Sequence, residues 1–320
     1  MPQVLLIAGT RPEAIKMAPV LHALHRSESL TPVLCSTGQH REMLRQAWEA
    51  FGLVPDDTMD VMTNAQTLAG LSSRLFSAVD AELEARRPDF LLIQGDTTTV
   101  MVAATCAFYR GIPVGHVEAG LRSRDLRKPF PEEFTRRLAS LATTLHFAPT
   151  RGAAENLLAE HIAPDRIVVT GNTVVDALHF MRERVRKNQP ELPAAIHESI
   201  RKGRHIVLVT VHRRELSAEG LQAICQTIEH LAKDFPDTDF VWPVHLNPRI
   251  KDTVTARLGS VSNILRWNTP YSSTCWIGVT SSSAIPGGFR KKPRLSGNRC
   301  LYCGRLRNVP KPLHLASVAC

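Results

Sequence analysis

Three carboxylates in one short stretch of this sequence could carry acid–base chemistry. Asp96 and Glu118 each follow a short apolar run bounded by glycine or proline, and Glu132 comes shortly afterwards in the chain. Runs of this kind are typical of buried parallel strands. The carboxyl ends of parallel strands meet at one edge of a sheet, where open α/β proteins bind their ligands. A partly dry site there suits carboxyl groups that serve as general acid and general base.

A simpler interpretation is that these acids only stabilise the fold. Asp96 precedes three threonines and could cap a helix, and most acidic side chains are solvated. Because three acids fall in one window, two of them at strand ends, we favour the catalytic interpretation.

Two further groups of residues could bind an anion. Arg11 and Lys16 follow the first apolar run, at the turn and first helical turn where a phosphate would meet a helix N-terminus. No G-x-G-x-x-G or P-loop pattern accompanies them, so an ordinary surface pair is the alternative. His212 ends a strand in the second half of the chain, beside two arginines, and a solvated surface histidine is the alternative there.

The elements that must position these residues alternate between strand and helix. We expect strands at 4–8, 32–37, 90–94, 113–117, 145–148, 166–170, 206–210 and 240–244. We expect helices from 13, at 42–51, at 65–86, from 98, from 131, and at 150–160, 175–186 and 218–233. This alternation predicts an α/β protein with parallel sheets covered by helices on both faces. A polar linker containing proline, residues 187–193, suggests two doubly wound domains that face a cleft.

Composition places the excess positive charge in one segment. The net charge of the 320 residues is +9, yet residues 1–252 carry 29 basic and 30 acidic residues. Residues 253–320 contain ten Lys or Arg and no acid. The first four-fifths therefore looks like a neutral globular protein, with an aberrant basic tail. No signal peptide or membrane-spanning run is recognisable, and seven cysteines, mostly without paired spacing, fit a cytoplasmic protein.

Several short motifs resemble one family, the non-hydrolysing UDP-N-acetylglucosamine 2-epimerases. They occur in family order over residues 1–265: Gly9-Thr10-Arg11-Pro12-Glu13-Ala14-Ile15-Lys16, Thr37-Gly38-Gln39-His40, Gln94-Gly95-Asp96-Thr97, His116-Val117-Glu118-Ala119-Gly120-Leu121-Arg122, Pro131-Glu132-Glu133, Thr170-Gly171-Asn172-Thr173-Val174-Val175-Asp176-Ala177-Leu178, His212-Arg213-Arg214-Glu215 and Pro243-Val244-His245-Leu246-Asn247-Pro248. A mild departure is Phe134-Thr135-Arg136, where the family commonly has Ala-Asn-Arg.

The resemblance implies a fold and a reaction. It implies two Rossmann-like domains around a cleft, the glycosyltransferase-B arrangement, usually as a homodimer. We place the first domain at residues 1–187 and the start of an incomplete second domain at 188–265. The implied reaction inverts C2 of UDP-N-acetylglucosamine to give UDP-N-acetylmannosamine, by elimination of UDP and its addition to the other face. It needs no redox cofactor and no metal.

The resemblance also implies roles for individual residues. Asp96, Glu118 and Glu132 fall on the family's catalytic carboxylates, without showing which is the base and which the acid. His212 falls on the histidine that steadies the departing UDP. Arg11 and Lys16 fall on the basic pair that binds the nucleotide.

The resemblance stops near residue 265. The family continues with an Asp-Ser-Gly-Gly-Ile-Gln-Glu-Glu-Ala-Pro stretch that grips the UDP diphosphate, whereas this chain has Gly287-Gly288-Phe289-Arg290-Lys291-Lys292-Pro293. Codons for the last five residues, read one base earlier, can encode Ile-Gln-Glu-Glu-Ala. We therefore hypothesise that residues 266–320 are a frameshifted reading, a hypothesis that the DNA sequence tests. We expect this tail to be disordered and the turnover of this chain to be low.

Other functions are less well supported by the sequence. Cys300 and Cys303 form a lone C-x-x-C without zinc-ribbon spacing, and the basic tail lacks a nucleic-acid-binding motif. We expect a UDP-sugar as the partner, and neither nucleic acid nor a membrane. The alternatives kept open are the hydrolysing 2-epimerase or another glycosyltransferase-B enzyme acting on UDP-sugars, and a non-catalytic nucleotide-binding protein.

Overall fold

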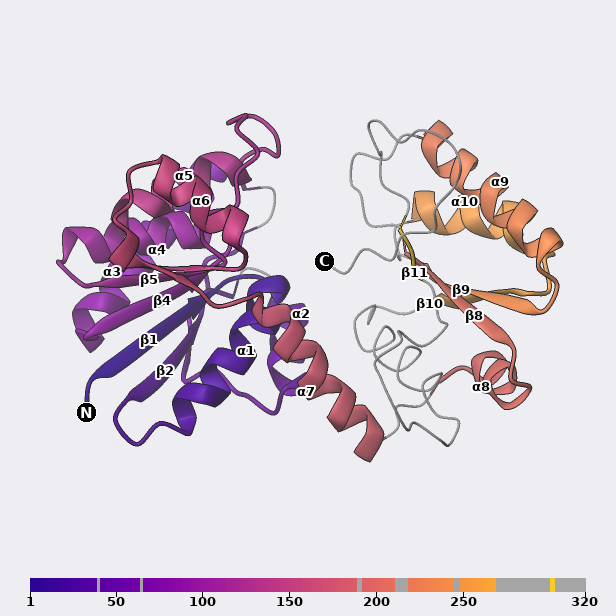
Figure 1. Cartoon of the computed structure of the whole chain (residues 1–320), viewed down its shortest axis with the longest axis horizontal. Coiled ribbons are helices and arrows are strands. Elements are labelled where there is room, and N and C mark those ends of the chain that lie inside the picture. Colours follow the sequence, from indigo (N-terminus) through magenta and orange to yellow (C-terminus); the bar gives the residue numbers. More distant parts are fainter. Residues whose placement is uncertain are drawn as a thin grey trace. The chain divides into compact units, whose positions relative to one another are not determined.

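A computed structural model describes most of the chain, namely residues 1–38, 41–63, 66–188, 192–210, 218–244, 248–268 and 300–302. The chain divides into two compact units, Met1–Phe180 and Met181–Cys320. Each unit contains a parallel sheet with helices connecting its strands (Figure 1). The predicted α/β class with two parallel sheets is therefore confirmed.

The first unit is built on a seven-stranded sheet in the order β3-β2-β1-β4-β5-β6-β7, and all its strand pairs are parallel. The strands are β1 (Gln3–Ala8), β2 (Thr31–Ser36), β3 (Asp57–Thr58), β4 (Phe90–Gln94), β5 (Val114–Val117), β6 (Leu145–Ala148) and β7 (Ile167–Val169). The order reverses at β1 and β4, which are neighbours in the sheet. Such a switch point leaves room beyond the strand ends for a ligand.

Helices connect these strands and lie on both faces of the sheet (Figure 1). They are α1 (Arg11–His25), α2 (Arg41–Ala50), α3 (Leu68–Arg86), α4 (Thr98–Tyr109), α5 (Glu132–Ala142), α6 (Arg151–Ala159), the short η1 (Pro164–Arg166) and α7 (Thr173–Lys187). Helix α1 packs on β1, β2 and β4, whereas α4 lies between α3 and α5 on the opposite face. The main core lies under α3 and α4, where Leu75, Val79, Leu91, Ile93 and Val100 are fully buried.

The parallel arrangement brings three turns to one edge of the first sheet. These turns follow β1 at Gly9–Thr10, β4 at Gly95–Thr97 and β5 at Glu118–Gly120. Gly95 and Gly120 have φ angles of 85° and 86°, a region that residues with a side chain seldom occupy. The sharp turns therefore place the residues after each strand at the sheet edge.

The second unit has a four-stranded parallel sheet in the order β10-β9-β8-β11. Its elements are α8 (Ala194–Arg201), β8 (His205–Thr210), α9 (Ala218–Asp234), β9 (Thr238–Val244), α10 (Pro248–Leu258), β10 (Ile264–Asn268) and β11 (Cys300–Tyr302). Leu221, Cys225 and Ile228 of α9 pack with Phe240 and Trp242 of β9. The boundary between the units falls within α7.

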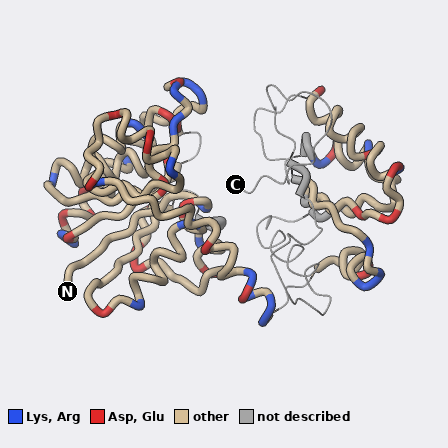
Figure 2. Tube along the Cα trace, viewed as in Figure 1, with Lys and Arg blue, Asp and Glu red and all other residues tan. Residues whose placement is uncertain are grey.

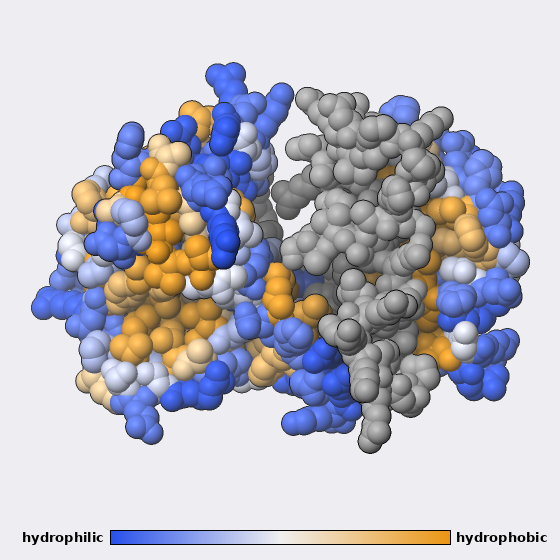
Figure 3. Space-filling view, viewed as in Figure 1, coloured by the Kyte–Doolittle hydropathy of each residue, from blue (hydrophilic) through white to orange (hydrophobic). Residues whose placement is uncertain are grey.

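The surface of the first unit has two notable features. The loop between β5 and α5 exposes Arg124, Arg127 and Lys128, and Figure 2 shows basic residues gathered there. Apolar side chains also gather on the visible face of this unit (Figure 3). Helices α4 and α5 contribute exposed apolar residues, among them Phe108, Tyr109, Phe134, Leu138 and Leu141.

Some sequence-based expectations differ from the structure or fall outside it. No predicted element corresponds to β3, β10, β11, α8, α10 or η1, because each is too short or too polar to give a clear periodic pattern. Of the predicted basic tail, residues 266–268 end β10 and 300–302 form β11. The remainder, including the expected disorder, lies outside the described residues. None of the helices in the described residues combines the length and the hydrophobicity that a membrane span requires.

Replacing a core leucine should destabilise the first unit strongly. Leu75 is fully buried in the core under α3 and α4, so Leu75→Ala should lower the free energy of unfolding by about 2–5 kcal/mol. Urea unfolding followed by circular dichroism measures the change. The exposed Leu158 on α6 is a matched control, and equal losses in Leu75→Ala and Leu158→Ala would contradict this packing.

Candidate functional site

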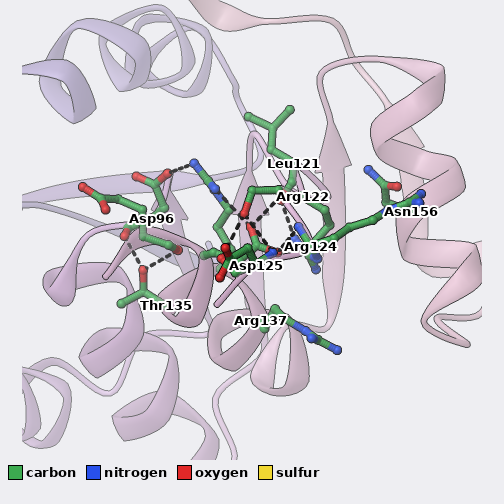
Figure 4. Close-up of polar contacts among 12 residues, drawn as sticks. Asp96, Leu121, Arg122, Arg124, Asp125, Thr135, Arg137 and Asn156 are labelled. Carbon is green, nitrogen blue, oxygen red and sulfur yellow. Dashed lines mark hydrogen bonds and ion pairs between the residues drawn. The ribbon is translucent and has the colours of Figure 1, made fainter. Parts of the chain in front are cut away.

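Asp96 lies in the turn between β4 and α4. Its Oδ2 accepts a hydrogen bond from Arg136 Nη2 at 2.5 Å, and its backbone carbonyl accepts one from the Thr135 hydroxyl (Figure 4). The N-cap of α4 is Thr97, whose side chain accepts from the Val100 amide. The interpretation of Asp96 as a helix cap is therefore wrong, and its carboxylate is held by α5 instead.

Glu118 follows β5, and three side chains donate hydrogen bonds to it. Its carboxylate accepts from Lys16 Nζ at 2.8 and 2.6 Å, from Gln94 Nε2 at 2.5 Å and from Asn172 Nδ2 at 2.9 Å. The side chain is 11% exposed. Three elements that are far apart in the sequence thus converge on one carboxylate and fix its position.

The backbone of Glu118 is strained. Its φ of 66° lies in the left-handed region, which costs a residue with a side chain about 1–3 kcal/mol. Such a conformation persists only where the surroundings enforce it, and residues in this state concentrate at functional sites. At Glu118, the hydrogen bonds to its carboxylate and the turn that follows it enforce the left-handed conformation.

Helix α6 holds the turn that follows Glu118. A Cβ added to Gly120 would come within 2.2 Å of the Ala153 carbonyl oxygen, so only glycine fits. Asn156 Nδ2 donates to the Gly120 carbonyl at 3.0 Å. The Arg122 side chain is nearly fully buried and donates to both carboxylate oxygens of Glu160 at 2.8 Å, which lowers the pKa of that carboxyl.

Glu132 is the first residue of α5 and differs from its neighbour Glu133. Glu133 is buried and accepts from the backbone amides of Ser123 and Arg124 and from Arg136 Nη1. Glu132 Oε2 is also buried, but it has no hydrogen-bond partner among the described residues. A buried polar atom without a partner is unfavourable, so this oxygen is suited to a group supplied by a ligand.

Glu13 fixes the two turns at the switch point relative to each other. It is buried and accepts from the backbone amides of Gly9 at 2.6 Å and Thr10 at 2.7 Å, and from the Thr97 hydroxyl at 2.5 Å. Burial raises the pKa of the Glu13 carboxyl above its usual value. Arg11 stands at the start of α1, where burial lowers the pKa of its guanidinium.

The structure gathers several of the predicted residues at one sheet edge. Lys16 and Glu118 are in direct contact, and Asp96 is linked to the helix that begins with Glu132. Lys16, which the resemblance assigns to the nucleotide, thus has a carboxylate partner in this structure. His212 lies outside the described residues. The catalytic and binding roles of all these residues stay predictions.

Sequence reasoning missed the residues that support the acids. Gln94 and Asn172 lie within family motifs and Arg136 lies just after one, but no local pattern assigns any of them a partner. Arg136 follows Glu132 by four positions, and this helical spacing is the one signal that could have placed it near the site. The contacts of Gln94 and Asn172 join residues that are far apart in the sequence, so no local pattern predicts them.

Two buried histidines lie side by side on β5 and β6. His116 pairs in register with His146, and its Nε2 is 2.7 Å from the Gly95 carbonyl oxygen. Since a carbonyl only accepts, Nε2 must carry the proton. His116 Nδ1 and both ring nitrogens of His146 have no partner among the described residues. Burial lowers the pKa of each histidine to about 4.

Comparison with known proteins points to one family. The sequence profile described as UDP-N-acetylglucosamine 2-epimerase matches residues 22–285. The chain is 43% identical over 266 residues to UDP-N-acetylglucosamine 2-epimerases from Yersinia pestis and Escherichia coli K12, spanning 82% of this chain and 70% of each relative.

Solved structures agree with this similarity. A UDP-GlcNAc 2-epimerase from Neisseria meningitidis bound to UDP-GlcNAc is 39% identical, with a TM-score of 0.77 over 88% of this chain and 76% of the other. One from Methanocaldococcus jannaschii in complex with UDP-GlcNAc and UDP is 30% identical, with a TM-score of 0.68 over 83% of this chain and 73% of the other.

Acidification should destabilise the first unit through its buried histidines. An unfolded histidine has a pKa near 6.5, so between pH 6.5 and 4 the unfolded chain binds more protons than the folded one. The free energy of unfolding should therefore fall as the pH drops through this window, by up to roughly 3 kcal/mol for each histidine. Urea unfolding at pH 7, 6 and 5 measures this. His146→Leu should give a shallower pH dependence, and an unchanged dependence would contradict the assignment.

Proposed function

Since this chain belongs to the UDP-N-acetylglucosamine 2-epimerase family, we propose that it interconverts UDP-N-acetylglucosamine and UDP-N-acetylmannosamine. The family match and the identity to epimerases from several bacteria support the reaction. Within the molecule, the proposal rests on the arrangement of three acidic residues at the edge of the first sheet. There Asp96 and Glu118 lie in the turns that follow two adjacent strands, and Glu132 begins a helix that contacts Asp96.

The proposed reaction has two halves. A general base removes the proton from C2 while the bond between C1 and the UDP oxygen breaks, which leaves UDP and 2-acetamidoglucal. UDP then adds back to C1 as a general acid delivers a proton to the opposite face of C2. The three carboxylates supply groups of the required kind, and cations offset the charge that builds up on the departing diphosphate.

The carboxylates differ in how firmly the protein holds them. Glu118 is engaged by three donors and Asp96 by a guanidinium, so both are preorganised before substrate arrives. Glu132 retains one buried oxygen without a partner in the described part of the chain. This oxygen is the natural contact for a substrate hydrogen. The proposal leaves open which of the three acts as base and which as acid.

For the nucleotide, we propose Arg11, Lys16 and His212 as binding residues, with His212 also steadying the departing UDP. Lys16 Nζ would then contact both the Glu118 carboxylate and the ligand. This contact would bring the substrate next to the proposed catalytic carboxylate. The exposed cations of the loop between β5 and α5 add positive charge near this edge. The basic tail lacks the family's diphosphate-binding sequence, so we expect turnover by this chain to be low.

We also propose that the chain forms a homodimer through α4 and α5. Phe134, Leu138 and Leu141 recur at helical spacing on α5 and are exposed, and Phe108 and Tyr109 are exposed on the adjacent α4. An apolar face of this kind is typical of an interface. A cytoplasmic location is part of the proposal, because Cys35, Cys106 and Cys225 are buried free thiols, as expected in a reducing compartment.

Removing any one of the three carboxylates should abolish turnover. Asp96→Asn, Glu118→Gln and Glu132→Gln should each reduce the rate of epimerisation by at least about 100-fold, because each removes a group that transfers or orients a proton. Proton NMR of UDP-N-acetylglucosamine in D₂O measures product and deuterium at C2, both in this chain and in a version restored to the family reading frame.

Two controls accompany that measurement. Glu155→Gln changes an exposed acid on α6 and should leave the rate unchanged. Near-normal rates in all three carboxylate variants would remove the catalytic assignment. Release of free sugar in step with UDP, without UDP-N-acetylmannosamine, would instead favour the hydrolysing relative.

A charge on the α4 and α5 face should prevent dimer formation. Leu141 is 78% exposed, so Leu141→Asp should leave the fold unchanged but yield a monomer in sedimentation velocity. Leu158→Asp on α6, which alters an exposed leucine outside this face, should leave the dimer intact. A monomeric parent chain at tens of micromolar would contradict the proposed homodimer.

A further inference from the structure

We propose that Arg136 is a positioning residue that holds the Asp96 carboxylate in place for the reaction. The inference rests on the proposed function, because it assigns Asp96 a role in proton transfer. Arg136 itself is directed at two acids of the protein. It therefore acts through Asp96 and not on the substrate.

The guanidinium of Arg136 bridges two carboxylates. Nη2 is 2.5 Å from Asp96 Oδ2, and Nη1 is 3.2 Å from Glu133 Oε2. Glu133 is buried and is itself fixed by the backbone amides of Ser123 and Arg124. The anchored acid orients the planar fork of Arg136, and the fork then fixes Asp96. A lysine could not reproduce this, because an ammonium is a point charge without a fixed fork.

The backbone around Asp96 is held as firmly as its carboxylate. The Thr135 hydroxyl donates to the Asp96 carbonyl, and His116 donates to the carbonyl of the preceding Gly95 at 2.7 Å. With the backbone fixed at both residues, rotation of the Asp96 side chain is the main freedom left. That side chain is 28% exposed, so without Arg136 it could turn toward water.

The same helix carries another candidate carboxylate. Glu132 is the first residue of α5, and Arg136 lies one turn later. A single rigid turn thus sets where Asp96 stands relative to Glu132. Because a misplacement of about 1 Å can lower a rate about 100-fold, this link bears directly on catalysis.

Kinetics of Arg136 variants test the role in the reaction. Arg136→Met should lower kcat about 30- to 100-fold while KM changes less than about twofold, since the contact orients a reacting group and does not bind substrate. Arg136→Lys should recover part of the loss, because it restores the charge without the fork. Arg137→Met is the matched control, as Arg137 is the next residue on α5 and its side chain is half exposed. Equal kcat in Arg136→Met and Arg137→Met would overturn the proposal.

Thermal unfolding provides a test that does not depend on activity. If Arg136 holds Asp96, the loss of melting temperature in the double variant Asp96→Ala with Arg136→Met should be smaller than the sum of the two single losses. Additive losses would overturn the proposal whether or not the chain is active. If the unsubstituted chain shows no turnover, this result contradicts the proposed function but not the role of Arg136. The comparison of melting temperatures then tests whether Arg136 holds Asp96.

Discussion

The ion pair between Lys16 and Glu118 is the interaction on which the arrangement of this site depends. It joins the first turns of α1 to the end of β5, across 102 positions of the sequence. Gln94 from β4 and Asn172 from the turn before α7 complete the ring of donors around the same carboxylate. A charge this poorly exposed is tolerated only with such partners, so the fold must bring four separate segments together to accommodate it.

The strain at Glu118 follows from the same constraint. The carboxylate can reach its donors only if the backbone turns sharply after β5, and the left-handed conformation of Glu118 and the glycine at 120 provide that turn. Helix α6 makes the turn rigid through Asn156 and the buried pair of Arg122 with Glu160. The local cost of the strained residue is thus offset by contacts that lie outside the site. Asp96 is likewise held by a neighbouring helix, because α5 supplies both the guanidinium and the hydroxyl that contact it.

Beneath these charged groups the sheet buries polar side chains in neutral form. His116 and His146 sit side by side on β5 and β6, and burial lowers the pKa of each to about 4. His116 also supports the Gly95 carbonyl, so the interior of the sheet contributes to the placement of the turn that carries Asp96. The edge of the sheet is therefore charged and preorganised, while the layer below it is uncharged near neutral pH and more sensitive to acid.

The α/β class, most of the helices and strands, and the strand ends that precede Asp96 and Glu118 are all predictable from the sequence. This is possible because apolar runs, glycine turns and helical periodicity are local patterns. No local pattern predicts β3, β10, β11, α8 or α10, whose sequences are short or polar. The donor that each acid has emerges only in the folded chain: Arg136 for Asp96, and Lys16, Gln94 and Asn172 for Glu118. These pairings depend on how the parallel sheet orders its strands and on where α5 crosses the edge, and no spacing along the chain encodes such contacts.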